Sequence, residues 1–188
     1  MLATVAAGAA GGLTAAVLST AAPRPWLAAT PAAISGTLAG LVSASATCIV
    51  APLWTHVPVA AVAAGVAQLA QWGLRKLQVD DATSAAAVHL GGGAVSILAV
   101  GFFAEPQRLL SLPGVPPQAA AAASAGVAFG GDGSQLGVQA VWLLFVLGWT
   151  AALVLPVCLG LQAFGVLRSP DTALTAGAPL RARCAAAR

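Results

Sequence analysis

The sequence predicts an all-α membrane protein with about five transmembrane helices, the last of them long. Of its 188 residues, 59% are hydrophobic and only 7% are charged, and the mean hydropathy is +0.91. A soluble domain carries about 25% charged residues, so this chain could not solvate its own surface. Uncharged stretches long enough to cross ~30 Å of hydrocarbon follow one another along the chain, and the basic residues between them sort to one side.

Alanine supplies much of this hydrophobicity. It is close to neutral for membrane insertion when compared with Leu, Ile, Phe or Val. Alanine-rich spans insert marginally but pack tightly, so we expect other helices, rather than lipid, to line them.

Composition and motifs exclude several classes of function. The net charge of +3 comes without a basic run of interleaved aromatic residues, so no nucleic-acid partner is expected. The sequence contains no recognisable nucleophile–base pair, phosphate loop or metal cluster, so we expect no enzyme activity, cofactor or metal. Cys48, Cys158 and Cys184 lack metal or redox spacing. We interpret the first two as small apolar residues within spans.

Residues 2–20 can cross the bilayer, if thinly, because no charged side chain occurs before Pro23. The alternative is a secretory signal or transit peptide that ends near S-T-A-A-P. A signal peptide normally starts with Lys or Arg, and a transit peptide is rich in Arg. Neither feature is present, which favours a span.

The uncharged stretch of residues 25–74 is too long for one crossing and suits two, at residues 31–51 and 57–74. Gly36 and Gly40 form a small-xxx-small face for close helix contact. Trp54, in the turn between these spans, suits an interfacial anchor. His56 in the same turn is interpreted as a solvated loop histidine. Near the far end of the second span, Gln68 and Gln71 are expected to be paired or close to water.

The fourth predicted span covers residues 82–104. Asp80 or Asp81 can cap its start, where a carboxylate also suits the positive end of the helix dipole. The run Gly91, Gly92 and Gly93 lowers helix propensity by ~1 kcal/mol per residue relative to Ala. We therefore expect another backbone to come very close at that level.

His89 is the one ionisable side chain within the predicted spans, apart from the weakly acidic cysteines, and it lies ~10 Å inside the inner end of its helix. Intramembrane ionisable groups mark a pathway or a site by default. Ala85 and Ala86 one turn below, and Gly92 and Gly93 one turn above, leave space beside its ring. The competing interpretation is a buried histidine that bonds to a serine or a backbone carbonyl for packing alone, and the residues by themselves do not decide between the two.

Beyond Glu105, residues 109–131 also lack charge up to Asp132, but three prolines disfavour a spanning helix. We predict an external loop there, with a short helix at 118–125. The last span, 136–167, must tilt, kink at Pro156 or project beyond the bilayer. Residues 169–188 are expected to form a loosely ordered cytoplasmic tail.

Five spans place only Arg108 among the basic residues on one side. The other side collects Arg24, Arg75, Lys76, Arg168, Arg181, Arg183 and Arg188. This positive-inside distribution predicts an outside N-terminus and an inside C-terminus, with Asp80 and Asp81 at the cytoplasmic face.

Three stretches in order resemble signatures of the Amt/Rh-type ammonium transporters. Residues 79–93, V-D-D-A-T-S-A-A-A-V-H-L-G-G-G, are similar to the family's V-D-D-x-x-D-x-x-x-V-H-G-x-G-G. Residues 35–42, S-G-T-L-A-G-L-V, resemble its S-G-x-x-A-G-L-V, and residues 130–139 resemble the loop that enters its long final helix. V-L-R-S-P at residues 166–170 resembles the tail junction, so the resemblance covers about residues 1–170.

The resemblance implies an ammonium-transporter-like helical bundle with eleven helices per subunit, two inverted halves, a pore in each subunit and a homotrimer. Ammonium would bind outside and lose its proton before passing a pair of histidines, the second of which His89 matches. Ala85 matches a pore-facing position. The resemblance also implies ammonium or ammonia as substrate, the plasma membrane as location, and a cytoplasmic regulatory protein of the P-II type as a partner.

Residues 1–168 correspond to the C-terminal part of such a domain, its last five helices, so neither the first pore histidine nor the outer aromatic site has a counterpart. Ser84 stands where the family often has Asp, Leu90 replaces a common glycine, and Ala46 and Ile49 replace a proline and a glycine. A pore built from inverted repeats needs both halves to enclose it. We therefore expect transport only together with the missing N-terminal half.

Three hypotheses follow from these observations. The chain is a truncated ammonium transporter, a non-conducting subunit that associates with complete transporters, or an unrelated structural membrane protein.

Overall fold

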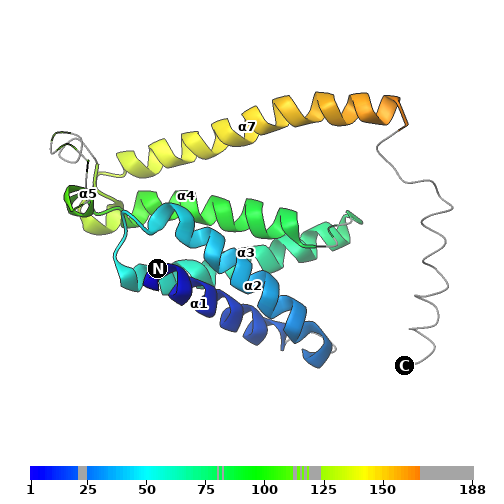
Figure 1. Cartoon of the computed structure of the whole chain (residues 1–188), viewed down its shortest axis with the longest axis horizontal. Helices are drawn as coiled ribbons and strands as arrows, with labels where there is room; N and C mark the ends of the chain where they lie inside the picture. Colours follow the sequence, from blue (N-terminus) through cyan, green and yellow to red (C-terminus); the bar gives the residue numbers. More distant parts are fainter. Residues whose placement is uncertain are drawn as a thin grey trace. The chain divides into compact units, whose positions relative to one another are not determined.

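The computed structural model describes residues 1–20, 25–79, 81, 83–111, 114, 116, 118 and 124–165, without the side chains of residues 25–28, 109 and 110. All regular structure in these residues is helical, which confirms the predicted all-α fold. The chain divides into two units, residues 1–143 and 144–188. The elements are α1 (Leu2–Ser19), α2 (Pro25–Thr47), η1 (Leu53–Thr55), α3 (His56–Lys76), η2 (Ala87–Gly91), α4 (Gly92–Phe103), α5 (Pro106–Leu110), η3 (Val127–Phe129) and α7 (Ser134–Ala163), and Figure 1 labels most of the helices.

Within the first unit, α2 packs against α1, α3 and α4 (Figure 1). The interior of this bundle consists largely of alanine, because small side chains allow the helices to approach closely. Three buried clusters hold it together: Ala7 with Ala44 and Ala60, Ala15 with Ala32 and Ala64, and Ala39 with Ala67 and Val88.

The contact between α1 and α2 is backbone to backbone. A Cβ built at Gly40 would overlap the carbonyl oxygen of Ala7 and lie 3.0 Å from its carbonyl carbon. A Cβ at Gly36 would lie 2.5 Å from the carbonyl oxygen of Gly11. Because no side chain fits at either position, the glycines determine how closely these two helices approach.

Three of the described helical segments are long and apolar enough to cross a membrane, namely residues 2–19, 53–76 and 134–163. Helices also cover the other two predicted spans, with different bounds. α2 begins at Pro25 and contains Pro31 inside it, whereas the sequence-based bounds were 31–51. Helices in membranes tolerate such a proline because neighbouring groups satisfy the freed carbonyl. α2 ends at Thr47, beyond which Cys48 is exposed and the Val50 carbonyl accepts a hydrogen bond from the Glu105 N–H, 2.8 Å away.

The interpretation of His56 as a solvated loop residue is wrong. His56 is the first residue of α3 and only 1% exposed. Its Nδ1 lies 3.1 Å from the Pro52 carbonyl oxygen and 3.3 Å from that of Leu53, so the ring donates to the end of the turn that precedes its own helix. The proline-rich turn folds the imidazole back into the bundle instead of into water.

The fourth predicted span is not one regular helix. Helical residues begin at Ala85, pass through a π turn at η2 (Ala87–Gly91) and continue as α4 to Phe103. A π turn takes about one residue more than an α turn and occurs often at functional sites. It changes the direction in which the residues before Gly92 point relative to those after it.

The connection from α4 to α7 returns tightly to the end of α4. The Gly126 N–H donates to the Ala104 carbonyl oxygen at 2.8 Å, and Arg108 forms an ion pair of 2.7 Å with Glu105.

Asp132 lies just before α7. Hydrogen bonds from Ser134, first from its side chain and then from its backbone, lower the pKa of Asp132 below its ordinary value. Most of the predicted helix 118–125 and the tail 169–188 lie outside the described residues.

α7 begins at Ser134 and its described part ends at Ala163, close to the predicted span 136–167. Pro156 lies inside it, at the position where a kink was considered. The helix runs from the first unit into the second.

Candidate functional site

The candidate site begins where Asp81 binds the first turn of the helix that carries His89. The Asp81 carboxylate accepts hydrogen bonds from the Ala85 N–H at 2.9 Å and from the Ala87 N–H at 3.3 Å. These N–H groups have no partner within the helix, and the carboxylate also faces the positive end of the helix dipole. Asp80, the other candidate cap, lies outside the described residues.

Ser84 lies between this cap and the helix with a positive φ of 58°. A left-handed backbone is costly for L-residues other than Gly, and Asn or Asp tolerate it better than most. Ser84 is the position where the family often has Asp. The helix therefore starts from a strained residue whose carbonyl still accepts the Val88 N–H at 2.9 Å.

His89 lies in the middle of the π turn, and its ring is exposed in this chain. Its neighbour Val88 is 1% exposed and packs against Ala39 of α2 and Ala67 of α3. Among the described residues, no hydrogen-bond partner of the His89 ring is found. The ring is therefore neither packed in the interior nor fixed to a backbone carbonyl, and its donor and acceptor are both available.

The three glycines after His89 have different surroundings. A Cβ at Gly92 would lie 3.1 Å from the Ala39 carbonyl oxygen, and one at Gly91 would lie 3.3 Å from Val66 Cγ1. A Cβ at Gly93 would meet no atom of the described residues within 4 Å. Close approach of a neighbouring helix therefore explains Gly92, and more weakly Gly91, but not Gly93.

The sequence interpretation did not identify Ser96, which fixes α4 to α2. The Ser96 hydroxyl donates to the Ser43 carbonyl oxygen at 2.8 Å and accepts from the Ala46 N–H at 3.1 Å. It is 1% exposed. Ala46 stands where the family usually has proline, and only a residue other than proline can supply this N–H. The signal was available as a serine in the apolar half of a predicted span, but nothing in the sequence indicates its partner.

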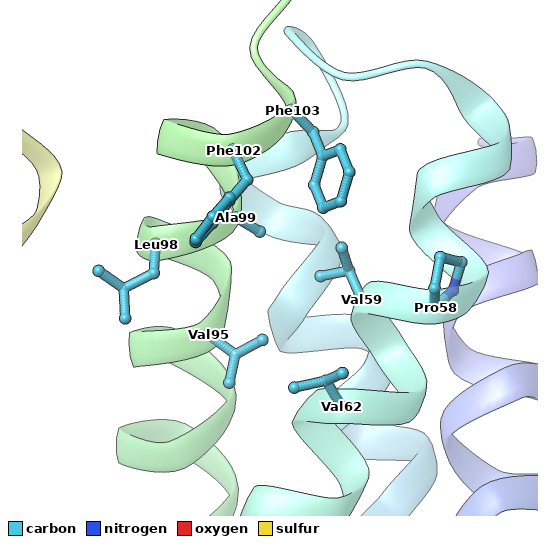
Figure 2. A pocket seen from close by; sticks show the side chains of 8 residues that line it. All are labelled: Pro58, Val59, Val62, Val95, Leu98, Ala99, Phe102 and Phe103. Atoms are coloured by element: carbon cyan, nitrogen blue, oxygen red, sulfur yellow. The ribbon is translucent and has the colours of Figure 1, made fainter. Parts of the chain in front are cut away.

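An apolar pocket of about 380 Å³ lies between α3 and α4 (Figure 2). Its lining residues are Pro58, Val59, Val62, Val95, Leu98, Ala99, Phe102 and Phe103. Phe103 also contacts Trp54 edge to face, with ring centroids 6.0 Å apart. Neither His89 nor any other predicted site residue lines this pocket, and its lining side chains are apolar, so it offers no polar side-chain group for chemistry.

The other end of α3 carries the basic residues of the described bundle. Lys76 Nζ lies 4.0 Å from the centre of the Trp72 ring, and Arg75 Nη2 donates to Gln71 Oε1 at 3.4 Å. Gln68 Nε2 donates to Ser35 Oγ of α2 at 3.3 Å. The two glutamines are therefore paired by side chains, although Nε2 of Gln71 is buried without a partner in the described residues.

Comparison with known proteins places this arrangement in a family. The model of the Ammonium Transporter Family matches residues 1–181. The chain is 31% identical over 140 residues to ammonium transporter 3 of Dictyostelium discoideum, covering 72% of this chain and 30% of that protein. It is 32% identical over 139 residues to ammonium transporter 1 member 1 of Solanum lycopersicum, covering 71% of this chain and 27% of that protein.

The fold is similar to that of Saccharomyces cerevisiae Mep2, with a TM-score of 0.74 and 24% identity. This match covers 89% of the chain and 38% of Mep2. The chain thus spans less than a third of the two relatives' length and less than two fifths of Mep2. Its apolar helices and its relatives make it an integral membrane protein, and the chain belongs to the ammonium transporter family.

Proposed function

We propose that this chain takes part in moving ammonium or ammonia across the membrane, with His89 as the group that coordinates the substrate or relays its proton. The observation that carries this proposal is the exposed imidazole on an otherwise apolar helix, without a hydrogen-bond partner among the described residues. An imidazole fixed for packing would be buried and bonded. Membership of the ammonium transporter family supports ammonium or ammonia as the substrate.

In its neutral form an imidazole offers one N–H donor and one acceptor nitrogen. Ammonia carries a lone pair and three N–H groups, so it can accept from one ring nitrogen and donate to the other. Ammonium would lose its proton outside the apolar segment, because a charge is costly at bilayer depth. Asp81 fixes the start of the helix that presents the ring, and Ala85 lies one turn nearer to that start.

The exposed ring also implies that conduction requires more helices. A pathway of inverted repeats needs a second wall to exclude lipid, and the His89 face is open in this chain. We propose that a further set of membrane helices covers it, and that the assembled form is a homotrimer in the plasma membrane. The C-terminus would be cytoplasmic, within reach of a P-II-type regulatory protein.

His89→Ala tests the proposal. The chain is produced behind the N-terminal segment of the Dictyostelium relative, and methylammonium uptake is measured at matched membrane abundance. The variant is expected to change uptake or ion selectivity while assembly stays intact. Leu90→Ala is the matched control, because Leu90 is also exposed and lies in the same turn. Unchanged uptake and selectivity in His89→Ala would count against a role for the ring in the pathway.

A second function is a non-conducting subunit that associates with complete transporters. The observation that favours it is that α7 is a long apolar helix, of the length and composition that cross a membrane and contact other membrane helices. Co-purification of the chain with a complete transporter, with no uptake by the chain alone or by its chimera, would support this function. Uptake by the chimera would favour the first.

A further inference from the structure

The π turn aligns three residues of one helix along its axis. In an α-helix four steps of ~100° exceed a full turn by about 40°, so residues four apart drift around the axis. A π turn uses about one residue more per turn, and this reduces the drift across Ala85, His89 and Gly93. The three residues therefore lie close to one line, His89 in the centre and Gly93 ~6 Å further along the axis.

The opposite side of this segment faces the bundle. Ala87 and Val88 are each 1% exposed, and Ser96 bonds to α2. Ala85 and His89 are exposed, and the position of a Gly93 side chain is empty to 4 Å. Within the described part of the first unit, no neighbouring helix covers the line of Ala85, His89 and Gly93, whereas Gly91 and Gly92 border other helices.

We propose that Gly93 determines the size of what passes His89, because its missing side chain leaves the clearance directly beyond the imidazole. This inference rests on the proposed function of His89. Packing within the described residues does not explain the glycine, since a Cβ at this position meets none of their atoms within 4 Å. A helix interior also disfavours glycine by ~1 kcal/mol relative to alanine, so the folded chain gains no stability from it.

The first test uses the chimera described above, in lipid nanodiscs, because the chain alone leaves the His89 face open to lipid. It does not depend on transport, and the cysteines of the N-terminal segment are replaced by alanine. Cys48, Cys158 and Cys184 are replaced by alanine, and single cysteines are introduced by Gly93→Cys, His89→Cys, Val88→Cys and Ala99→Cys. The probe is methanethiosulfonate ethylammonium, a water-soluble cation that carries a primary ammonium group. Gly93→Cys and His89→Cys are expected to react about tenfold faster, or more, than the buried controls, because a thiol must meet water to ionise and react.

Two results would overturn the proposal. One is a Gly93→Cys thiol that reacts no faster than the thiols of Val88→Cys and Ala99→Cys. The other is a thiol that reacts with an apolar maleimide but not with the cationic probe, since position 93 would then face lipid. Circular dichroism of each variant confirms that the helices remain folded.

The second test is a size series in the chimera used for His89. Gly93→Ala is expected to reduce methylammonium uptake relative to ammonium uptake by about tenfold, because one methyl group discriminates by that order in a narrow apolar site. Gly93→Leu is expected to abolish both. Gly73→Ala on α3, where a Cβ also meets nothing within 4 Å, should leave the ratio unchanged.

The two tests separate failure of this inference from failure of the proposed function. A fast-reacting Gly93→Cys together with an unchanged uptake ratio in Gly93→Ala and Gly93→Leu overturns the role of Gly93 alone. If His89→Ala leaves uptake unchanged while the Gly93 series changes it, the role of the imidazole fails and the clearance at Gly93 stands. If the chimera does not conduct, the labelling rates still decide whether position 93 borders a water-accessible path.

Discussion

Gly40→Ala perturbs the place where α1 and α2 meet backbone to backbone. The new methyl group would overlap the Ala7 carbonyl oxygen and lie 3.3 Å from Gly11 Cα. Neither contact is with the flexible end of a side chain, so the helices themselves must separate. We expect the variant to lower the free energy of unfolding.

The magnitude follows from two opposing terms. Overpacking of a well-packed contact costs about 1–3 kcal/mol, and the clash with a backbone group places this site toward the upper end. Replacing glycine by alanine within a helix returns ~1 kcal/mol. The net loss is about 1–2 kcal/mol, which corresponds to a decrease in Tm of about 2–8 °C for a chain of this size.

The measurement is thermal unfolding in detergent micelles followed by circular dichroism. Gly65→Ala on α3 is the matched control, because a Cβ there meets nothing within 4 Å. It keeps the propensity gain without the clash and should raise the Tm slightly. Equal Tm shifts for Gly40→Ala and Gly65→Ala would refute the close contact between α1 and α2.

Two further predictions concern the helix that carries His89. Ser96→Ala removes the hydroxyl that bridges the Ser43 carbonyl and the Ala46 N–H, and this loss of two hydrogen bonds should cost about 1–3 kcal/mol. Ser45→Ala, which removes only a hydrogen bond to its own helix, is the control. Equal unfolding free energies for the two variants would contradict the bridging role. Ser84→Val forces a β-branched residue into a φ of 58° and should lower the free energy of unfolding by about 1–3 kcal/mol. Ser84→Gly is the control and should be neutral or stabilising, because glycine adopts a positive φ without strain. A Ser84→Val variant as stable as the unmodified chain would argue against the left-handed backbone.

Hydropathy predicted the approximate positions of the helices well. A segment that crosses the bilayer must be long and uncharged, and such segments are visible in the sequence. Each of the five predicted spans contains a helix over much of its described length, and the ends of α1 and α3 lie within two residues of the predicted ones. The starting residue of α2 was wrong, since a proline near a helix start looks like a boundary when neighbouring helices are unknown. His56 was wrong for a similar reason: a turn rich in proline suggests solvent, and only the three-dimensional fold brings its ring into the interior.

The π turn could not be predicted from the sequence. Its single extra residue leaves no mark on composition or hydrophobic periodicity over so short a segment. For the same reason the three glycines looked equivalent, although Gly92 faces α2 and a Cβ at Gly93 would meet no atom of the described residues within 4 Å. The sequence shows a histidine followed by three glycines. Which way each of these residues points from the helix axis depends on the helical rotation per residue, which the π turn changes.

The contacts around α2 connect the scaffold to His89. Gly40 of α2 lies against α1, while the carbonyl of the preceding residue, Ala39, faces Gly92, which directly follows the π turn. α2 therefore has little room to move toward either side, since backbone meets backbone on both. A substitution that pushes α2 away from α1 must displace Gly92, and with it the π turn that directs His89. We infer that the small residues of α1 and α2, remote from the imidazole in sequence, hold its ring in position, and that Gly40→Ala should change the labelling rate of His89→Cys as well as stability.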